Sequence, residues 1–188
     1  IVARDQRKLA AVAEELDSRY GVAVHAHSVD LSEPAAAEKL WAATSKAGIV
    51  VDVLVNNAGL GMYGEFSDQS VDALTSMQSV NAIALTTLTR LVLPGMLVRK
   101  RGRILNIASV VGYQPGGPRM AAYYATKAYV LSFSKGLARE LDGTGVSVTV
   151  LSPGLTESSF ERLAGARETR HYRLLPQMTA AAVASIGY

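Results

Sequence analysis

Short apolar runs alternate with longer amphipathic stretches along most of this chain of 188 residues. The runs are rich in valine, isoleucine and leucine, and the stretch 49–55 is nearly continuously apolar, as is typical of a strand buried on both faces of a sheet. The predicted strands are residues 1–4, 22–29, 49–55, 102–109 and 146–154.

The amphipathic stretches between these runs predict helices. Asp5 is placed to cap the first helix and Gly21 follows its end, while Ser32 and Pro34 suit the N-cap and first turn of the second. The predicted helices are residues 6–18, 33–47, 71–99 and 121–141, with another beginning within 178–188.

Two features disturb the long helix predicted over residues 71–99. Asn81 lies inside it, although asparagine competes for backbone hydrogen bonds and is a poor interior helix residue. Pro94, followed by Gly95, is expected to kink or break the same helix nearer its end.

Composition narrows the class of protein. Apolar residues make up 49% of the chain and charged residues 19%, as in a globular protein of one domain. No apolar run reaches the ~18 to 20 residues of a membrane span, and the first residues do not form a signal peptide. The lack of cysteine excludes disulfides and thiol nucleophiles, and we expect a cytoplasmic location. The net charge of +3 comes from scattered basic residues, so no nucleic-acid partner is expected.

Tyr123 and Lys127 are four residues apart near the start of the helix predicted at 121–141. Side chains at this spacing share one helix face. A free phenol titrates near pH ~10, and a nearby cation favours the phenolate and so lowers the tyrosine pKa. Tyr123 thereby becomes a usable general acid or base near neutral pH. The pair alone is a weak signal, because Tyr-x-x-x-Lys occurs by chance in many helices.

Polar motifs at the ends of three predicted strands strengthen that signal. Ser109 ends the strand at 102–109, and the carboxyl end of a parallel strand is where such sheets bind ligands. In this order and at these spacings the chain resembles the short-chain dehydrogenases/reductases over nearly its whole length. The resemblance rests on Asn56-Asn57-Ala58-Gly59, Asn81, Ser109, Tyr123-x-x-x-Lys127 and Pro153-Gly154.

The resemblance implies a doubly wound, Rossmann-like α/β fold with a parallel sheet, and an oxidoreductase. Such an enzyme moves a hydride between NADP and a small carbonyl or secondary alcohol. Tyr123 would exchange a proton with the substrate oxygen, and Lys127 would lower the pKa of Tyr123 and hold the nicotinamide ribose. Ser109 would hydrogen-bond the substrate oxygen, and Asn81 would anchor a water path to the lysine.

The resemblance also places the adenine end of the cofactor. Members that prefer NAD usually have an acidic residue at the end of the strand equivalent to residues 1–4. This chain has Ala3 followed by Arg4 there. Arginine can pair with a 2′-phosphate, so NADP is favoured over NAD, although Arg4 is also compatible with a solvated strand end. Asp30 and Leu31 would contact the adenine, unless Asp30 merely opens the turn before the next helix.

The remaining cofactor contacts are expected where the later strands end. Thr156 and Ser158 stand where the family usually has a branched apolar residue and a threonine that meet the nicotinamide carboxamide, so the chain departs slightly from the pattern. The full set implied for this side of the cofactor is Asn57, Ala58, Gly59, Tyr123, Lys127, Pro153, Gly154, Thr156 and Ser158.

Three segments are predicted to border the substrate. Residues 60–66 combine glycines with Met62 and Tyr63, which are equally compatible with an ordinary core or interface. Residues 112–120 are rich in glycine and proline and join the strand ending at Ser109 to the helix of Tyr123. Residues 160–175 are polar and mixed, which suggests a mobile lid.

The family's opening strand and glycine-rich turn have no counterpart before Arg4. We therefore expect an internal piece of a family member of roughly 250 residues, without the first strand–helix unit and the last strand. In the family that first strand lies between the strand ending at Ala3 and the strand at 49–55. A gap is expected there, and the chain alone should be inactive and poorly folded. The family often forms dimers through the helices equivalent to 71–99 and 121–141, so a homo-dimer or tetramer is expected.

Two other functions remain open. A binding or regulatory protein that keeps the fold without turnover is disfavoured by the intact Ser109, Tyr123 and Lys127. A serine hydrolase is disfavoured because Ser109 lies outside any Gly-x-Ser-x-Gly elbow and no histidine is placed as a base. His25 and His27 point to one face of a strand but lack a third ligand, so no metal is expected.

Overall fold

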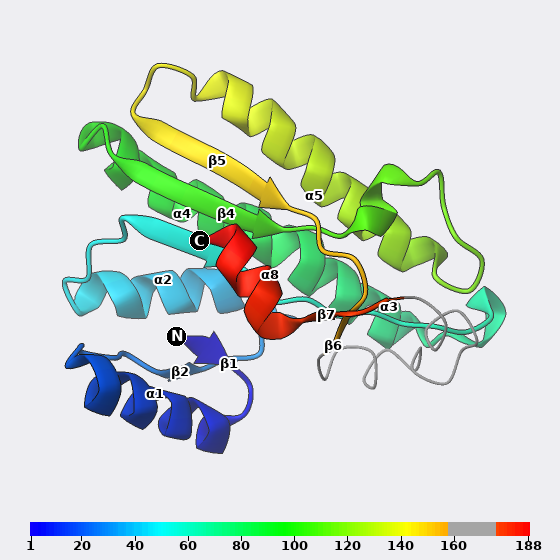
Figure 1. Ribbon diagram of the computed structural model, residues 1–188, viewed down its shortest axis with the longest axis horizontal. Coiled ribbons are helices and arrows are strands. Elements are labelled where there is room, and N and C mark those ends of the chain that lie inside the picture. The colour runs from blue at the N-terminus through cyan, green and yellow to red at the C-terminus, as the bar shows by residue number, and fades with distance from the viewer. Residues whose placement is uncertain (158–175) are drawn as a thin grey trace.

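The computed structural model, which describes residues 1–157 and 176–188, is an α/β fold of parallel strands flanked by helices (Figure 1). The described strands pair as three separate parallel sheets. These are β1 (Val2–Ala3) with β2 (His27–Ser28), then β3 (Val53–Asn56), β4 (Gly102–Ile107) and β5 (Val146–Leu151), and last β6 (Thr156–Glu157) with β7 (Met178–Thr179). The predicted lid at 160–175 and Ser158 lie outside the described residues.

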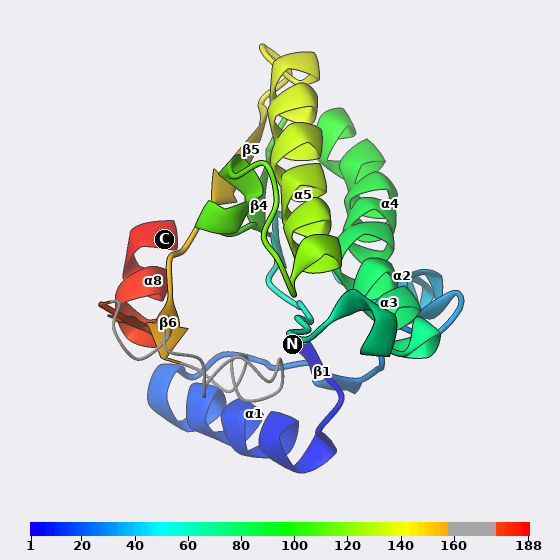
Figure 2. The same ribbon diagram turned by 90° about the vertical axis from the view of Figure 1, so that its right-hand side faces the viewer.

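The three-stranded sheet β3-β4-β5 forms the core together with the helices α4 and α5, which cover one of its faces. Figure 2 shows α4 and α5 on one side of it and α8 on the other. Leu54, Ile104 and Val148 lie side by side in the register of the three strands, and all three belong to a cluster with Val92 and Met96 of α4. The helices are α1 (Gln6–Tyr20), α2 (Ala36–Lys46), α3 (Val71–Gln78), α4 (Leu85–Val98), α5 (Ala121–Glu140) and α8 (Ala180–Gly187), with short 3₁₀ turns at Phe66–Asp68 and Val110–Tyr113.

The sheet is incomplete between β1 and β3, as the sequence predicted. Among the described residues no strand joins the two, so β3 pairs only with β4. The apolar side chains of Val53 and Val55 are 57% and 52% exposed as a result. A strand that the sequence predicts to be buried on both faces therefore leaves apolar surface uncovered, which is unfavourable in water.

The first two helices agree only partly with the prediction. Asp5 caps α1 by accepting from the backbone of Arg7 and Lys8, both at 3.1 Å. The predicted Ser32 cap of α2 is wrong, because Ser32 instead donates to Asp30 and the helix begins later, after Ala35. The strand predicted at 22–29 is reduced to β2, since β1 offers only two residues to pair with it.

The long helix is disturbed at Asn81 but not at Pro94. Between α3 and α4 the backbone forms a π-helical segment, Ser79–Ala84, which contains Asn81. π-Segments of this kind are frequent at functional sites. The predicted break at Pro94 is wrong, because α4 continues to Val98. Pro94 has no backbone N–H, so the carbonyl of Arg90 loses its helical hydrogen-bond donor. Both residues are exposed, and water can donate to that carbonyl instead.

Contrary to the prediction that no apolar run is long enough to span a membrane, the helical run from Val71 to Val98 is long and apolar enough to cross one by length and composition alone. Part of this run packs in the core. Met77 and Met96 are buried in the protein, and the polar side chains of Asn81 and Thr89 bond to other elements of the fold.

A polar network crosses the core between the sheet and its helices. Asn56 of β3 donates through Nδ2 to Asn106 Oδ1 of β4 at 2.9 Å and to Thr89 Oγ1 of α4 at 3.1 Å. Asn106 Nδ2 in turn donates to Ser134 Oγ of α5 at 2.9 Å. All four side chains are buried, so each bond satisfies a group that water cannot reach. The network therefore fixes four elements against one another.

Replacing the central member of this network tests its importance. Asn106→Ala leaves partners on Asn56 and Ser134 unsatisfied, and we expect it to lower the free energy of unfolding by about 2 to 4 kcal/mol. Chemical denaturation measures the change, and Ser147→Ala on the exposed face of β5 is the matched control, expected within ~0.5 kcal/mol of the wild type. A cost below about 1 kcal/mol for Asn106→Ala would contradict the role.

Candidate active site

A buried cation lies one helical turn from a buried phenol. Lys127 and Tyr123 of α5 are only 5% and 7% exposed, and Lys127 Nζ lies 5.9 Å from the centre of the Tyr123 ring. The ammonium donates to the backbone oxygen of Ile107, at the end of β4, at 2.9 Å. Burial lowers the pKa of Lys127 to about 8, because desolvation penalises its charged form. The spacing read from the sequence therefore places both groups in one enclosed site.

The turn after β3 passes directly beside this lysine. A Cβ atom at Gly59 would lie 3.6 Å from both Lys127 Nζ and Asn81 Oδ1, which is ordinary van der Waals contact and places the turn beside both side chains. Asn57 and Ala58, just before it, are exposed at the carboxyl end of the strand. This is the edge at which open parallel sheets bind ligands.

Asn81 joins that turn to α5. Its carboxamide accepts from Leu60 N and donates to Leu60 O, both at 2.8 Å, and also donates to Thr126 Oγ1 at 3.0 Å. The Thr126 hydroxyl donates to the backbone oxygen of Tyr123 at 2.8 Å. Asn81 therefore holds the β3 turn and the backbone of Tyr123 in one hydrogen-bonded chain, and its expected link to a water remains a prediction.

Thr126 is a residue that the sequence analysis missed. It is three residues after Tyr123 and therefore on the helix face that Tyr123 and Lys127 share, which was the available signal. Its buried hydroxyl makes the contact that connects α5 to Asn81.

Ser109 stands at the carboxyl end of β4 and begins the 3₁₀ turn Val110–Tyr113. Its hydroxyl lies 3.4 Å from the carbonyl oxygen of Pro153, and Val110 N donates to the same oxygen at 3.0 Å. A Cβ at Gly112 would meet the backbone of Lys127 at 2.8 Å, so this turn packs directly on α5. Ser109 is thus held between the Pro153 turn and the helix that carries Tyr123.

The turn after β5 supplies the other residues expected at this edge. Pro153, Gly154 and Thr156 are half-buried, and Thr156 Oγ1 donates to Gly154 O at 3.1 Å. The carboxyl ends of β3, β4 and β5 therefore bring most of the predicted nicotinamide-side residues to one edge of the sheet.

The residues predicted for the adenine end lie apart, on the β1-β2 sheet. Arg4 and Asp30 form an ion pair at 3.7 Å, and Leu31 is half-buried next to them. The Ser32 backbone and hydroxyl donate to Asp30 Oδ1 at 2.9 and 2.6 Å, and the hydroxyl bond is the main cause that lowers the pKa of Asp30. Asp30 thus opens the turn before α2, while the Arg4 side chain remains 58% exposed.

The described residues hold no group of three side chains suited to a metal ion, which leaves His25 and His27 without a further ligand there. The site described above brings together a phenol, an ammonium, a hydroxyl and backbone groups.

Comparison with known proteins identifies the family. A sequence profile of the short-chain dehydrogenases matches residues 1–169. The chain is 34% identical to the short-chain dehydrogenase from Sphingobium yanoikuyae, solved in complex with NADPH, with a TM-score of 0.88 over 98% of this chain and 70% of that one. The protein belongs to the short-chain dehydrogenase family, as the motifs predicted.

Curated relatives are similar over most of this chain. The very-long-chain 3-oxoacyl-CoA reductase of Laccaria bicolor is 34% identical over 87% of the chain and 48% of the relative. The NADP-dependent 3-hydroxy acid dehydrogenase YdfG of Escherichia coli K12 is 39% identical over 86% of the chain and 65% of the relative. The chain thus spans about half to two thirds of the length of these relatives.

The buried lysine predicts how stability depends on pH. The pKa of Lys127 falls from 10.5 to about 8 on folding, so between these values the unfolded state binds more protons and stability rises with pH. Below pH 8 both states are protonated and the lysine adds no slope. After subtraction of the Lys127→Met curve, we expect the wild type to gain on the order of 3 kcal/mol between pH 8 and 10.5.

Denaturant unfolding at closely spaced pH values measures that difference, and methionine keeps most of the side-chain volume. A difference curve that is flat across this range would show that the ammonium is not desolvated in the folded protein.

Proposed function

We propose that the protein is an oxidoreductase that transfers a hydride between NADP(H) and a carbonyl or secondary alcohol. The observation that carries this proposal is the buried Lys127 ammonium one turn from Tyr123, at the edge where Ser109 ends its strand. The names of two similar proteins support the cofactor, since one was solved with NADPH and another is an NADP-dependent 3-hydroxy acid dehydrogenase.

The residues present fit a nicotinamide cofactor. Gly59 keeps the turn after β3 free of a side chain beside Lys127, and the exposed Asn57 and Ala58 offer a wall for a ligand. An ammonium has three N–H donors, of which Ile107 O accepts one. The others are available for the hydroxyls of a nicotinamide ribose, while Pro153, Gly154 and Thr156 would face the nicotinamide itself.

The cofactor, when bound, supplies or accepts the hydride at the substrate carbon. During reduction Tyr123 releases its phenolic proton to the substrate oxygen, and during oxidation its phenolate takes that proton back. The Lys127 ammonium, 5.9 Å from the centre of the Tyr123 ring, favours the phenolate form over the phenol. Ser109 donates its hydroxyl proton in a hydrogen bond to the same oxygen and stabilises the developing alkoxide.

NADP is proposed over NAD because of Arg4. Its guanidinium lies at the carboxyl end of the β1-β2 sheet, with most of its surface open to a ligand. Asp30, its ion-pair partner, would remain beside it and could accept from the adenine amine. A 2′-phosphate would pair with the guanidinium through charge-assisted bonds, whereas a 2′-hydroxyl would not.

Removal of the Tyr123 hydroxyl tests the proton transfer. In the full-length parent expected from the sequence, we expect Tyr123→Phe to lower kcat for carbonyl reduction by about 10²-fold or more, because the ring remains but the transferable proton is lost. NADPH binding, followed by fluorescence titration, should change little. Tyr124→Phe is the matched control, since the Tyr124 ring packs on Gly117 and phenylalanine preserves that contact. A Tyr123→Phe enzyme with near-normal kcat would refute the assignment.

Charge reversal at Arg4 tests the cofactor preference. In the full-length parent, we expect Arg4→Asp to lower kcat/KM for NADPH by roughly tenfold to a hundredfold, because it replaces a charge-assisted bond with repulsion. NADH should be used as well as before or better. Arg7→Asp, on the exposed surface of α1, changes the net charge equally and should leave both values unaltered. Equal use of both cofactors by the wild type would contradict the role of Arg4.

A further inference from the structure

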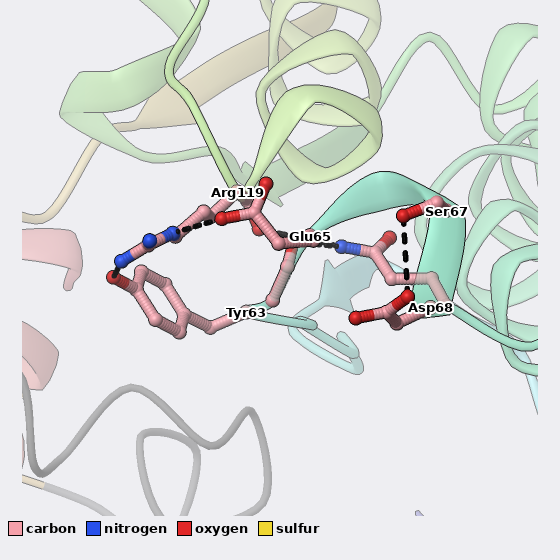
Figure 3. Close-up of polar contacts among 7 residues, drawn as sticks. Tyr63, Glu65, Ser67, Asp68 and Arg119 are labelled. Atoms are coloured by element: carbon pink, nitrogen blue, oxygen red, sulfur yellow. Dashed lines mark hydrogen bonds and ion pairs between the residues drawn. The ribbon is translucent and has the colours of Figure 1, made fainter.

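Two loops predicted to border the substrate meet at Arg119, directly before α5. One loop contains the predicted residues 60–66 and continues to residue 70, and the other, residues 112–120, follows Ser109. Figure 3 shows the Arg119 side chain crossing from its own loop to Glu65 and Tyr63 of the other. The two loops are far apart in sequence, so the contact is a tertiary feature of the site.

The side-chain contacts are directional. Arg119 Nε donates to Glu65 Oε1 at 2.7 Å, and Arg119 Nη1 donates to the Tyr63 hydroxyl at 3.3 Å. The guanidinium carbon also lies 6.0 Å from the centre of the Tyr63 ring, within the range of a cation–π contact. Both charged side chains are more than half exposed, at 53% and 60%, so this pair contributes little to overall stability.

The Arg119 backbone makes the second half of the contact. Arg119 has a φ of +66°, in the left-handed region that residues other than glycine seldom adopt. In this conformation its carbonyl oxygen accepts from Gly64 N at 3.0 Å and from Gln69 Nε2 at 3.3 Å. Gln69 Nε2 also donates to Gly64 O at 2.8 Å. A strained residue is thus retained where its carbonyl joins the two loops.

The same loop is anchored to α5 at its other end. Leu60 is held by Asn81, which bonds to Thr126, and Thr126 bonds to the backbone of Tyr123. Loop 60–70 is therefore attached to the chain on both sides of Tyr123, through Arg119 before it and Thr126 after it. A change in either attachment would shift the loop relative to the phenol.

We propose that Arg119 is a positioning residue for the reaction. Together with Glu65 and Gln69 it holds loop 60–70 against the start of α5 and so fixes the substrate pocket relative to the Tyr123 hydroxyl. This inference rests on the proposed function, because it assigns Arg119 a part in the same proton transfer. Small displacements of reacting groups lower the reaction rate by large factors, so loss of the Arg119 contacts should lower kcat.

The test is a double-mutant cycle with Arg119→Ala and Glu65→Ala, made in the full-length parent expected from the sequence and measured by steady-state carbonyl reduction with NADPH. Each single variant should lower kcat about tenfold, with KM for NADPH within about twofold of the wild type. The double variant should lose no more than either single one, because the residues act as a unit. Arg119→Lys keeps the charge and should restore part of kcat. Circular dichroism and thermal unfolding verify that each variant is folded.

Arg19→Ala is the matched control. Arg19 also pairs with a glutamate, Glu15, and also lies over a tyrosine ring, Tyr20, but on α1. Its replacement should leave kcat unchanged. If Arg119→Ala is folded and keeps kcat within twofold of the wild type, the inference is wrong. It is also wrong if Glu65→Ala leaves kcat intact and only lowers KM for anionic carbonyl substrates, since Arg119 would then read substrate charge.

The outcome with Tyr123→Phe separates this inference from the proposed function. If Tyr123→Phe is inactive while the Arg119 and Glu65 variants are fully active, only the positioning role is refuted. If Tyr123→Phe is active, both the proposed proton transfer and the positioning role are refuted.

Discussion

The burial of one ammonium group constrains the rest of this structure. Desolvating Lys127 costs free energy, so its surroundings must offer a fixed acceptor. Ile107 O at the end of β4 is the acceptor, and Gly59 in the turn after β3 lies directly beside the Nζ atom. The ends of two strands and the first turns of α5 must therefore meet at one point, which is also where Tyr123 lies.

Hydrogen bonds on either side of that point hold the elements in place. Deeper in the core, Asn106 joins the sheet to α5 through Ser134. Nearer the surface, Asn81 in the π-helical segment joins the β3 turn to Thr126. An asparagine that would weaken a regular helix thus serves here to connect elements, and the π-helical segment is the local departure that accommodates it.

The sequence predicted the parts of the site that depend on local spacing or on a strand end. The i, i+4 relation of Tyr123 and Lys127 follows from helix geometry, and Ser109 from its place after an apolar strand. Contacts between distant segments were not predictable in this way. Arg119 meets Glu65 only because two loops converge, and Ser32 is not the cap because α2 begins at Ala36, while the Ser32 hydroxyl donates to Asp30. The helix continues past Pro94. The rule that proline breaks a helix does not take into account that the Arg90 carbonyl is exposed there and can accept from water.

The central proposal is that, in the full-length parent expected from the sequence, this site directs a hydride from NADPH to a carbonyl carbon while the protein supplies the proton. Mass spectrometry of the alcohol formed with NADPH deuterated at the transferred position tests it most directly. The account predicts one deuterium on the carbinol carbon of the product, and none on that carbon when unlabelled NADPH is used in deuterated water. A product that takes its carbon-bound label from the solvent, or an absence of reduction across ketone and aldehyde substrates, would contradict it.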